Sequence, residues 1–255
     1  MGLQAQELLW SFGAARKRVE VWLTSCIVSS SPAGSELLIV PANERLVGTQ
    51  FTYFPVGGPT PVGREIGSPQ ESRKELATRL LYACESVDGL VSEYGGFPLD
   101  VARRAVRLSS GDEDYPIRCP AGEARRTEAG GLASLFPRGL VHAVAPFYGD
   151  DRWRETLART YEAAFRLAFR QQTHIVLTPL LGAGARGLPL PEAASVAATA
   201  ARAWYTAAAA AAAPATSSSS DNILRFGLQH QCDAEILVAE LESHFHADEI
   251  LTDFE

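Results

Sequence analysis

The chain has 255 residues, 46% of them hydrophobic and 21% charged, and a formal net charge of −7. This composition allows one substantial core, so we expect a single domain with insertions, and the lack of a basic face excludes a general nucleic-acid binder. No apolar stretch could span a bilayer and the N-terminus lacks a signal-peptide pattern, so we expect an intracellular protein, cytoplasmic or nuclear, with no membrane partner.

Apolar runs bounded by breaker residues predict five strands. They cover residues 19–23, 36–40, 140–145, 175–177 and 223–228. Asp151 is expected to cap a helix whose large side chains recur every four residues from Trp153 to Phe169. Further helices are expected to begin near Pro191 and after Asp233. Alternating strands and helices indicate an α/β fold, with a mixed sheet and helices on both of its faces.

A glycine-rich loop follows the apolar run at 174–177. Gly182, Gly184 and Gly187 lack side chains that would block a ligand, and a helix opens soon afterwards. Backbone N–H groups ahead of a helix N-terminus form a concave site for phosphate. Three glycines between a strand and a helix also suit an ordinary turn, so the loop alone leaves both interpretations open.

The four cysteines and the histidines predict no further chemistry. The cysteines form no CxxC pair, which fits reduced thiols, and Cys119 is expected to be a small core residue. His142 lies within an apolar run and is expected to be a hydrogen-bonded core residue. His244 and His246 do not share a helix face, so we expect no metal site and no cofactor. The Arg103-Arg104 pair fits a solvated helix end.

Several separate stretches, in the same order along the chain, resemble the macrodomain family. Residues 178–189 resemble its phosphate loop, and residues 38–48 resemble its strand followed by Asn-x-x-Leu-x-Gly. Residues 119–124 match its Cys-x-x-Gly-x-Ala stretch, and residues 140–146 resemble its Ile-His-x-Val-Gly-Pro strand. The resemblance covers roughly residues 19 to 245 and implies a three-layer α/β/α fold with a mixed central sheet.

The acidic motif of the family lies farther along this chain than the family pattern implies. In the family a Val-Asp-Gly motif follows the Asn motif almost at once, whereas here it stands at Val87-Asp88-Gly89. We therefore expect an insertion at about 49–85 that splits the first ligand loop. A capping box at Ser72-Arg-Lys-Glu75, ahead of Leu80 and Leu81, predicts that part of this insertion is helical.

These boundaries define the expected organisation of the chain. It has an N-terminal helical extension over residues 1–18, a macrodomain over 19–246 and a C-terminal tail over 247–255. A serine-rich segment at about 206–221 is expected to be a flexible linker, although its alanines could extend the preceding helix.

The resemblance implies that the chain binds ADP-ribose or an ADP-ribosylated protein and hydrolyses mono-ADP-ribose from protein side chains. Asn43 would direct its amide at the distal ribose, and Asp88 would act as general base or orient the attacking water. Simpler interpretations stay open. Asn43 suits the turn after a strand, and Asp88 suits the N-cap of the next helix.

The resemblance assigns ligand contacts to several loops. The residues are Asn43, Gly48, Val87, Asp88, Gly182, Ala183, Gly184, Ala185, Arg186, Gly187, Cys26, Ile27 and Leu228. Arg186 stands where the family often has an aromatic residue. Two interpretations of it stay open, a contact with phosphate and a solvated surface arginine.

Several of these positions depart from the family pattern. Cys26 replaces the aspartate that reads adenine, Leu228 replaces an aromatic residue, and Ser92 replaces a histidine. The glycines that usually precede the acidic residue are also missing. The alternatives are therefore a non-catalytic reader of ADP-ribose or a related nucleotide, a phosphatase acting on an ADP-ribose phosphate, and a degenerate domain whose insertion plugs the cleft.

Overall fold

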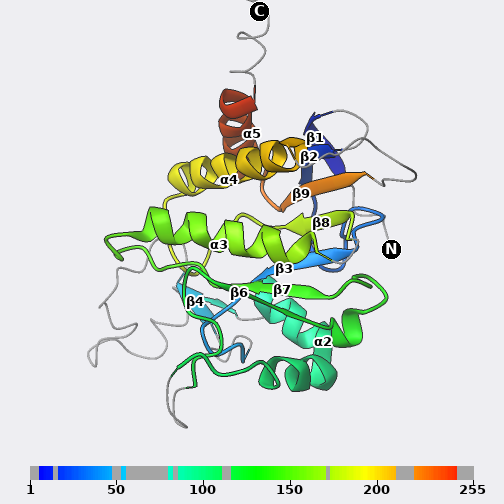
Figure 1. Cartoon of the computed structure of the whole chain (residues 1–255), viewed down its shortest axis with the longest axis vertical. Helices are drawn as coiled ribbons and strands as arrows, with labels where there is room; N and C mark the ends of the chain where they lie inside the picture. Colours follow the sequence, from blue (N-terminus) through cyan, green and yellow to red (C-terminus); the bar gives the residue numbers. More distant parts are fainter. Residues whose placement is uncertain are drawn as a thin grey trace, which may run out of the picture.

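A computed structural model describes most of the chain. The described residues are 6–13, 17–47, 53–55, 80–82, 86–110, 116–170, 173–210 and 221–245. They form a seven-stranded mixed sheet with helices on both faces (Figure 1), which confirms the expected three-layer α/β/α fold. No helix in this part of the chain is long and apolar enough to cross a bilayer.

The central sheet has the strand order β1-β2-β9-β8-β3-β7-β6. The strands are β1 (Glu7–Phe12), β2 (Lys17–Leu23), β3 (Leu37–Pro41), β6 (Ala124–Thr127), β7 (Leu140–Ala143), β8 (Ile175–Thr178) and β9 (Asn222–Leu228). The five inner strands are parallel, and β1 and β6 are antiparallel edge strands. The carboxyl ends of the inner strands therefore meet at one edge of the sheet.

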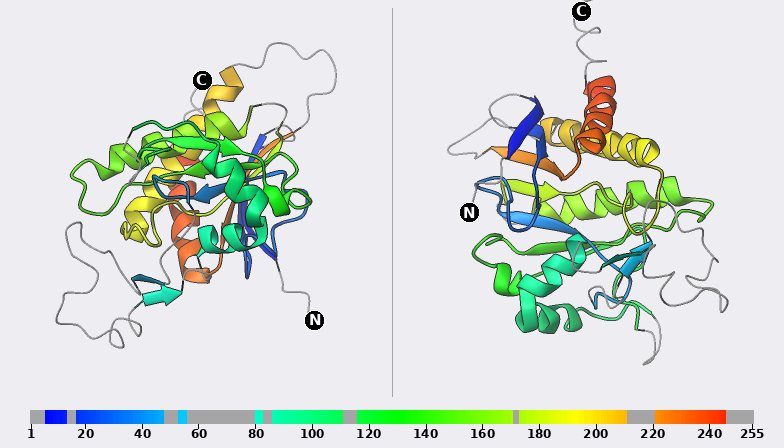
Figure 2. Two further views of the ribbon diagram at one scale, coloured as in Figure 1. Left: turned by 90° about the horizontal axis from the view of Figure 1, so that it is seen from below. Right: turned by 180° about the vertical axis from the view of Figure 1, so that it is seen from behind.

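Two cores lie on opposite faces of this sheet. Because side chains alternate along a strand, Leu37 and Ile39 of β3 face one core while Leu38 and Val40 face the other. The first core is covered by α3 (Trp153–Ala168), α4 (Leu190–Ala210) and α5 (Gln231–Phe245). The second is covered by α2 (Val87–Arg104) and the short helix η2 (Gly130–Leu132), as Figure 2 shows from two further sides.

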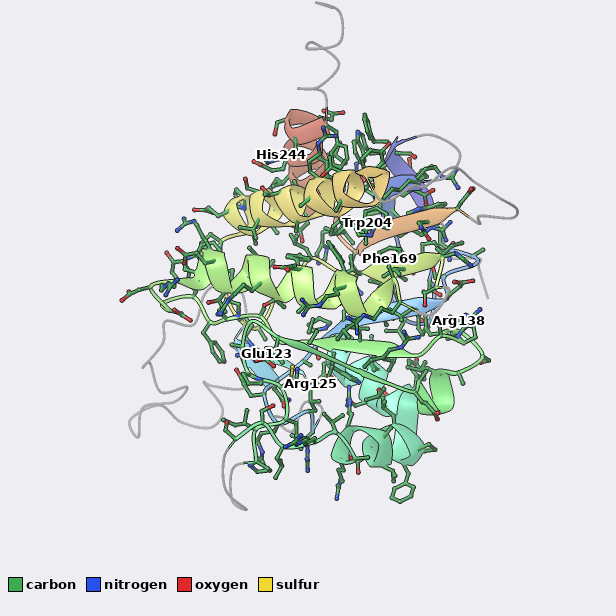
Figure 3. All side chains as sticks on the ribbon, in the orientation of Figure 1. Glu123, Arg125, Arg138, Phe169, Trp204 and His244 are labelled. Carbon is green, nitrogen blue, oxygen red and sulfur yellow. The ribbon has the colours of Figure 1, made fainter. Side chains whose placement is uncertain are left out.

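The structure confirms the predicted stripe of α3 but not the predicted cap at Asp151, because the N-cap residue is Arg152 and makes no side-chain capping bond. Trp153, Leu157, Tyr161 and Phe165 are buried along α3. Phe169, just beyond its end, stacks on Trp204 of α4 with ring centroids 4.6 Å apart (Figure 3). The Asp150 carboxylate accepts a hydrogen bond from the Arg152 N–H at 3.0 Å, in the turn that leads into the helix.

The N-terminal segment corrects the predicted helical extension. Residues 7–12 form β1, and a bulge between Leu8 and Trp10 shifts its register against β2. Trp10 and Phe12 pack on Phe245 of α5, with ring centroids 5.8 and 4.7 Å apart. The prediction of a helix is therefore wrong here, because cross-strand pairing and these aromatic contacts stabilise an extended edge strand.

The predicted insertion and the predicted linker both differ from expectation where they are described. Within residues 49–85, β4 (Tyr53–Pro55) pairs with β5 (Leu80–Tyr82) as a two-stranded antiparallel sheet. Leu80 and Leu81 are therefore extended rather than helical, whereas residues 71–79 lie outside the described residues. Residues 206–210 continue α4, as their alanines favour, so a linker can begin only after them. The expected C-terminal tail is also outside the described residues.

Candidate functional site

The predicted ligand loops leave the sheet at the edge where the parallel strands end. The loops after β2, β9, β8 and β3 follow strands that are consecutive neighbours in the sheet. The first two are joined directly, because the Thr24 N–H donates to the Leu228 carbonyl at 2.8 Å. Ligands of α/β sheets bind at such an edge, so the topology brings these loops to a position suited to binding.

The phosphate loop after β8 is closed by two internal hydrogen bonds. The Gly187 N–H donates to the Gly184 carbonyl at 2.8 Å, and the Leu188 N–H donates to the Gly182 carbonyl at 3.0 Å. Gly182 has a φ of 85°, and a Cβ there would lie 2.4 Å from the Leu188 side chain. Glycine is therefore required at this position.

The same loop presents unused backbone donors. Within the described part of the chain, the N–H groups of residues 182–186 donate to no other group. A Cβ added to Gly184 would meet nothing within 4 Å, so the loop is open at this point. The donors precede the N-terminus of α4, whose dipole also favours an anion. This arrangement can bind a phosphate or diphosphate.

Tyr161 of α3 anchors the start of this loop. The Leu181 N–H donates to the Tyr161 hydroxyl at 2.8 Å, and the tyrosine is fully buried. Burial raises the pKa of this phenol, so it stays protonated. The sequence identified Tyr161 only as part of the buried stripe, because nothing in the pattern indicates where its hydroxyl points.

Arg186 joins the phosphate loop to the loop after β3. Its two terminal nitrogens donate to the Glu44 carboxylate at 2.8 and 3.1 Å, and Nη2 also approaches the Ala42 carbonyl at 3.3 Å. The arginine side chain is only 12% exposed, so its interpretation as a solvated surface residue is wrong. Sequence reasoning missed Glu44, because its partner lies 142 positions away.

Asn43 has a structural role in the loop after β3. Its Oδ1 accepts a hydrogen bond from the Arg45 N–H at 3.1 Å, and its carbonyl accepts one from the Leu46 N–H at 3.1 Å. Leu46 is buried with a φ of 55°, so the turn is tight. The simpler interpretation of Asn43 as a turn residue is confirmed, and its contact with ribose stays a prediction.

Asp88 lies in the first turn of α2, two residues after the residue that caps the helix. The N-cap is Ser86, whose hydroxyl accepts from the Gly89 N–H at 3.0 Å, so the interpretation of Asp88 as the cap is wrong. The Asp88 carboxylate instead accepts from Arg103 Nη2 at 2.8 Å, in a pair with side chains 10% and 3% exposed. The carboxylate is thus held by a buried counter-charge.

A bend in α2 brings Arg103 back to Asp88. Gly96 has non-helical dihedral angles, with φ 57° and ψ −158°, which divide the helix into two segments. Ser92 completes the arrangement, because its hydroxyl accepts from Arg103 Nη1 at 2.7 Å and donates to the Asp88 carbonyl at 2.6 Å. The prediction of Arg103 as a solvated helix end is therefore wrong, since its charge and its long stem are buried.

The residues at the predicted adenine side form a tight turn after β2. Cys26 Sγ accepts from the Ser29 N–H at 3.4 Å, and the Cys26 carbonyl accepts from the Ser30 N–H at 2.9 Å. Burial alone would raise the pKa of the Cys26 thiol, but hydrogen bonds from residues 28–30 outweigh it and lower the pKa. Ile27 and Leu228 are buried in the two opposite cores, so they support this edge mainly by packing.

The remaining predicted positions contribute less. Val87 is half-buried against the core beneath α2, and Gly48 lies outside the described residues. Cys119 is fully buried, and burial raises the pKa of its thiol to about 12, which fits the predicted core residue. His142 is also fully buried, with Nε2 2.9 Å from the Thr127 hydroxyl, as predicted. The described residues contain no group of three or more metal-ligating side chains.

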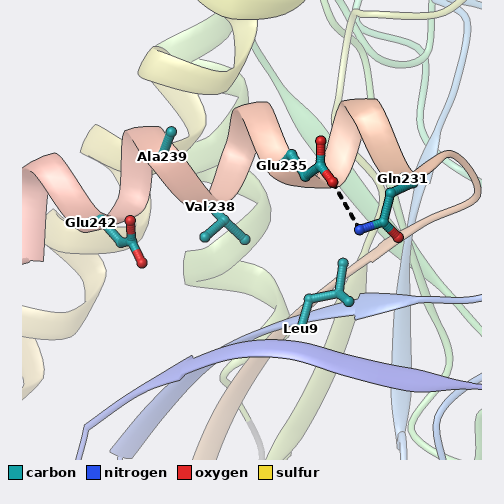
Figure 4. A pocket seen from close by; sticks show the side chains of 6 residues that line it. All are labelled: Leu9, Gln231, Glu235, Val238, Ala239 and Glu242. Atoms are coloured by element: carbon teal, nitrogen blue, oxygen red, sulfur yellow. Dashed lines mark hydrogen bonds between the residues drawn. The ribbon is translucent and has the colours of Figure 1, made fainter.

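Two shallow pockets lie away from these loops. One, of about 250 Å³, lies between β1 and α5 beside Leu9, Gln231 and Glu235 (Figure 4). The other, of about 490 Å³, lies along α2 and β6 beside Val101 and Arg126. Neither pocket is lined by a predicted site residue. The candidate site is therefore defined by the backbone donors and by the positions of the loops.

Comparisons with known proteins agree on one family. The macro domain family model matches residues 77–197, so the Asn43 loop lies ahead of the matched segment. A macro domain-containing protein of Vibrio parahaemolyticus is 37% identical over 112 residues, which cover 44% of this chain and 61% of the relative. An O-acetyl-ADP-ribose deacetylase of Citrobacter koseri is 32% identical over 113 residues, which cover 44% of this chain and 59% of that protein. The chain spans about half of the length of the curated relatives it matches.

Solved structures share the fold over most of the chain. The Oceanobacillus iheyensis macrodomain with ADP has a TM-score of 0.64 at 17% identity, covering 95% of this chain and 99% of the other. The Trypanosoma brucei macrodomain in complex with ADP-ribose has a TM-score of 0.51 at 15% identity, covering 88% of this chain and 68% of the other.

Proposed function

Because this chain belongs to the macrodomain family, we propose that it binds ADP-ribose at the carboxyl edge of its sheet. The observation that carries the proposal is the row of N–H groups at residues 182–186, ahead of α4, which donate to no group among the described residues. Their geometry suits a diphosphate. Macrodomain structures with ADP and ADP-ribose among its structural neighbours support the choice of ligand.

The loop order gives the ligand a direction along this edge. With the diphosphate on residues 182–186, the distal ribose extends toward Asn43 and Asp88, beyond β3. The adenosine extends the other way, toward the turn at Cys26 and the end of β9. Position 26 is a cysteine, so it offers no carboxylate to accept a hydrogen bond from the adenine amino group. We therefore expect the affinity to come mainly from the diphosphate and the ribose.

Calorimetric titration with ADP-ribose, and with AMP as the control, tests this proposal. Gly184→Glu is the sharpest variant, because open space at this position accepts a side chain while the new carboxylate repels the diphosphate. We expect Gly184→Glu to bind at least about tenfold more weakly than the matched Gly184→Gln. Equal binding of ADP-ribose by these two variants would overturn the placement, and no binding by the unmodified chain would overturn the ligand.

A second candidate is hydrolysis of mono-ADP-ribose from protein side chains. It is favoured by the position of Asp88 at the start of α2, and the relative named O-acetyl-ADP-ribose deacetylase supports ester hydrolysis. In this proposal the Asp88 carboxylate orients the attacking water and accepts its proton. The alternatives remain a reader without turnover and a phosphatase acting on an ADP-ribose phosphate.

Release of ADP-ribose from a mono-ADP-ribosylated protein distinguishes these alternatives. We expect Asp88→Asn to abolish turnover while ADP-ribose binding is retained, with thermal unfolding as the check that the variant is folded. Binding without turnover by the unmodified chain would identify a reader. Release of inorganic phosphate from an ADP-ribose phosphate, without release of ADP-ribose from protein, would identify the phosphatase.

A further inference from the structure

One arginine side chain ties together the loops that surround the distal end of the candidate site. Arg186 donates two hydrogen bonds to the Glu44 carboxylate. These bonds connect the phosphate loop to the loop after β3. Its guanidinium also lies over the Phe147 ring, 4.1 Å from the ring centroid. The Tyr148 N–H donates to the Arg186 carbonyl at 3.0 Å, so residues 147–148 hold both the side chain and the backbone of this residue.

The backbone of Glu44 is also held in place by hydrogen bonds. Its backbone carbonyl accepts from the Arg118 N–H at 2.8 Å and from the Cys119 N–H at 3.0 Å. The Glu44 side chain is 23% exposed, and the Arg186 side chain is 12% exposed. Two parallel hydrogen bonds make the geometry of this ion pair specific. Because both side chains are largely shielded from solvent, removing one of them leaves the charge of the other uncompensated.

We infer that Glu44 and Arg186 form a clasp that holds the phosphate loop in its anion-binding shape. Arg186 then raises the affinity for ADP-ribose through Glu44, as a positioning residue, and makes no contact with the diphosphate. The inference rests on the proposed binding function. Its physical basis is preorganisation, because a loop already fixed in its binding conformation loses less entropy when the ligand binds.

The opposing interpretation is a direct contact between Arg186 and phosphate. That contact would require the guanidinium to leave the Glu44 carboxylate and the Phe147 ring, since both occupy it here. The two interpretations predict different effects on ADP-ribose binding when Glu44 is neutralised. A clasp loses its function with either partner, whereas a phosphate-binding arginine is released when Glu44 is neutralised.

A double-mutant cycle on ADP-ribose affinity separates the two. With a clasp, Glu44→Gln and Arg186→Met each weaken binding by about tenfold, and the double variant is no weaker than either single one. Arg186→Lys also weakens binding, because an ammonium cannot form the two parallel bonds. If Glu44→Gln leaves binding unchanged or tighter while Arg186→Met weakens it, the clasp is overturned. Glu162→Gln, which breaks an exposed pair with Arg166 on α3, is the matched control and is expected to have no effect.

Hydrogen exchange in the ligand-free chain tests the clasp independently of ADP-ribose. The Gly187 and Leu188 N–H groups are protected by the internal bonds of the loop, so opening the clasp should expose them. We expect Glu44→Gln and Arg186→Met to accelerate exchange at both positions alike. If the unmodified chain binds no ADP-ribose, the proposed function fails, but faster exchange in both variants still supports the clasp. Unchanged exchange in both variants overturns it.

Discussion

Arg103 and its neighbour Arg104 show how burial determines what a charge contributes. Arg103 is 3% exposed and paired with Asp88, whereas Arg104 is 69% exposed and paired with Asp100. Arg103→Gln leaves the Asp88 carboxylate buried without its counter-charge, so we expect a loss of about 3–5 kcal/mol in the free energy of unfolding. Arg104→Gln removes a solvent-screened pair and should cost less than about 1 kcal/mol. Urea denaturation measures both, and equal losses would contradict the buried role of Arg103.

Cys26 and Cys119 provide a second contrast, in reactivity. The pKa of Cys26 is lowered, because hydrogen bonds outweigh its partial burial, whereas burial raises the pKa of Cys119 to about 12. The thiolate is the reactive form, so iodoacetamide should modify Cys26 much faster than Cys119, as measured by peptide mass spectrometry. Saturating ADP-ribose should slow the labelling of Cys26 and leave the exposed Cys232 unaffected. Unchanged labelling of Cys26 would argue against adenosine lying over this turn.

The sequence predicts site residues whose motif is local and misses those whose partner is distant. Asn43, Gly182 and Gly187 are recognisable because turn geometry favours their residue types. Glu44 and Arg103 carry no such pattern, since each acquires its role only when folding brings in a partner. Ser92 is an intermediate case. The sequence shows that the expected histidine is missing, but not that the serine accepts a hydrogen bond from a buried arginine.

At the scale of elements, α3 fixes the phosphate loop through a single hydroxyl. Tyr161→Phe keeps the buried ring but leaves the Leu181 N–H without its acceptor, so we expect a loss of about 1–3 kcal/mol in the free energy of unfolding. Exchange of the Leu181 N–H should accelerate at the same time. Tyr94→Phe is the matched control, because Tyr94 is 49% exposed on α2, and its effect should stay within about 0.5 kcal/mol. Equal effects of the two variants would show that the hydroxyl is not an anchor.

Burial also explains which elements the sequence predicts. The central strands β3 and β8 are parallel and largely buried, so their sequences are continuous apolar runs that stand out from their surroundings. The edge strand β6 has the sequence Ala-Arg-Arg-Thr, with three of its four residues only half-buried, and gives no such signal. The edge strand β1 also gives no clear strand signal, because an edge strand needs neither a continuous apolar run nor strict alternation.

At the scale of the whole molecule, topology brings the separate motifs to one edge of the sheet. The loops after β2, β3, β8 and β9 are far apart in the sequence, and they meet because these parallel strands end at one edge of the sheet. The order of the motifs was therefore sufficient to predict the fold, and the location of the site at this edge stays a prediction. The contacts between loops, such as the Glu44–Arg186 clasp, depend on side-chain geometry that the order of motifs does not determine.

His142 makes the stability of the whole domain depend on pH. Burial, and secondarily the charge of Arg103, hold its pKa well below the ordinary value of 6.5. Below pH 6.5 the unfolded chain therefore binds a proton that the folded chain does not, so stability falls as the pH is lowered. The expected slope is up to about 1.4 kcal/mol per pH unit for this one group.

The variant His142→Gln removes this titrating group. Urea denaturation at pH values between about 5 and 7 should therefore show that its free energy of unfolding depends less steeply on pH than that of the unmodified chain. Parallel curves for the two proteins would mean that His142 is protonated in the folded state or that other groups dominate this range.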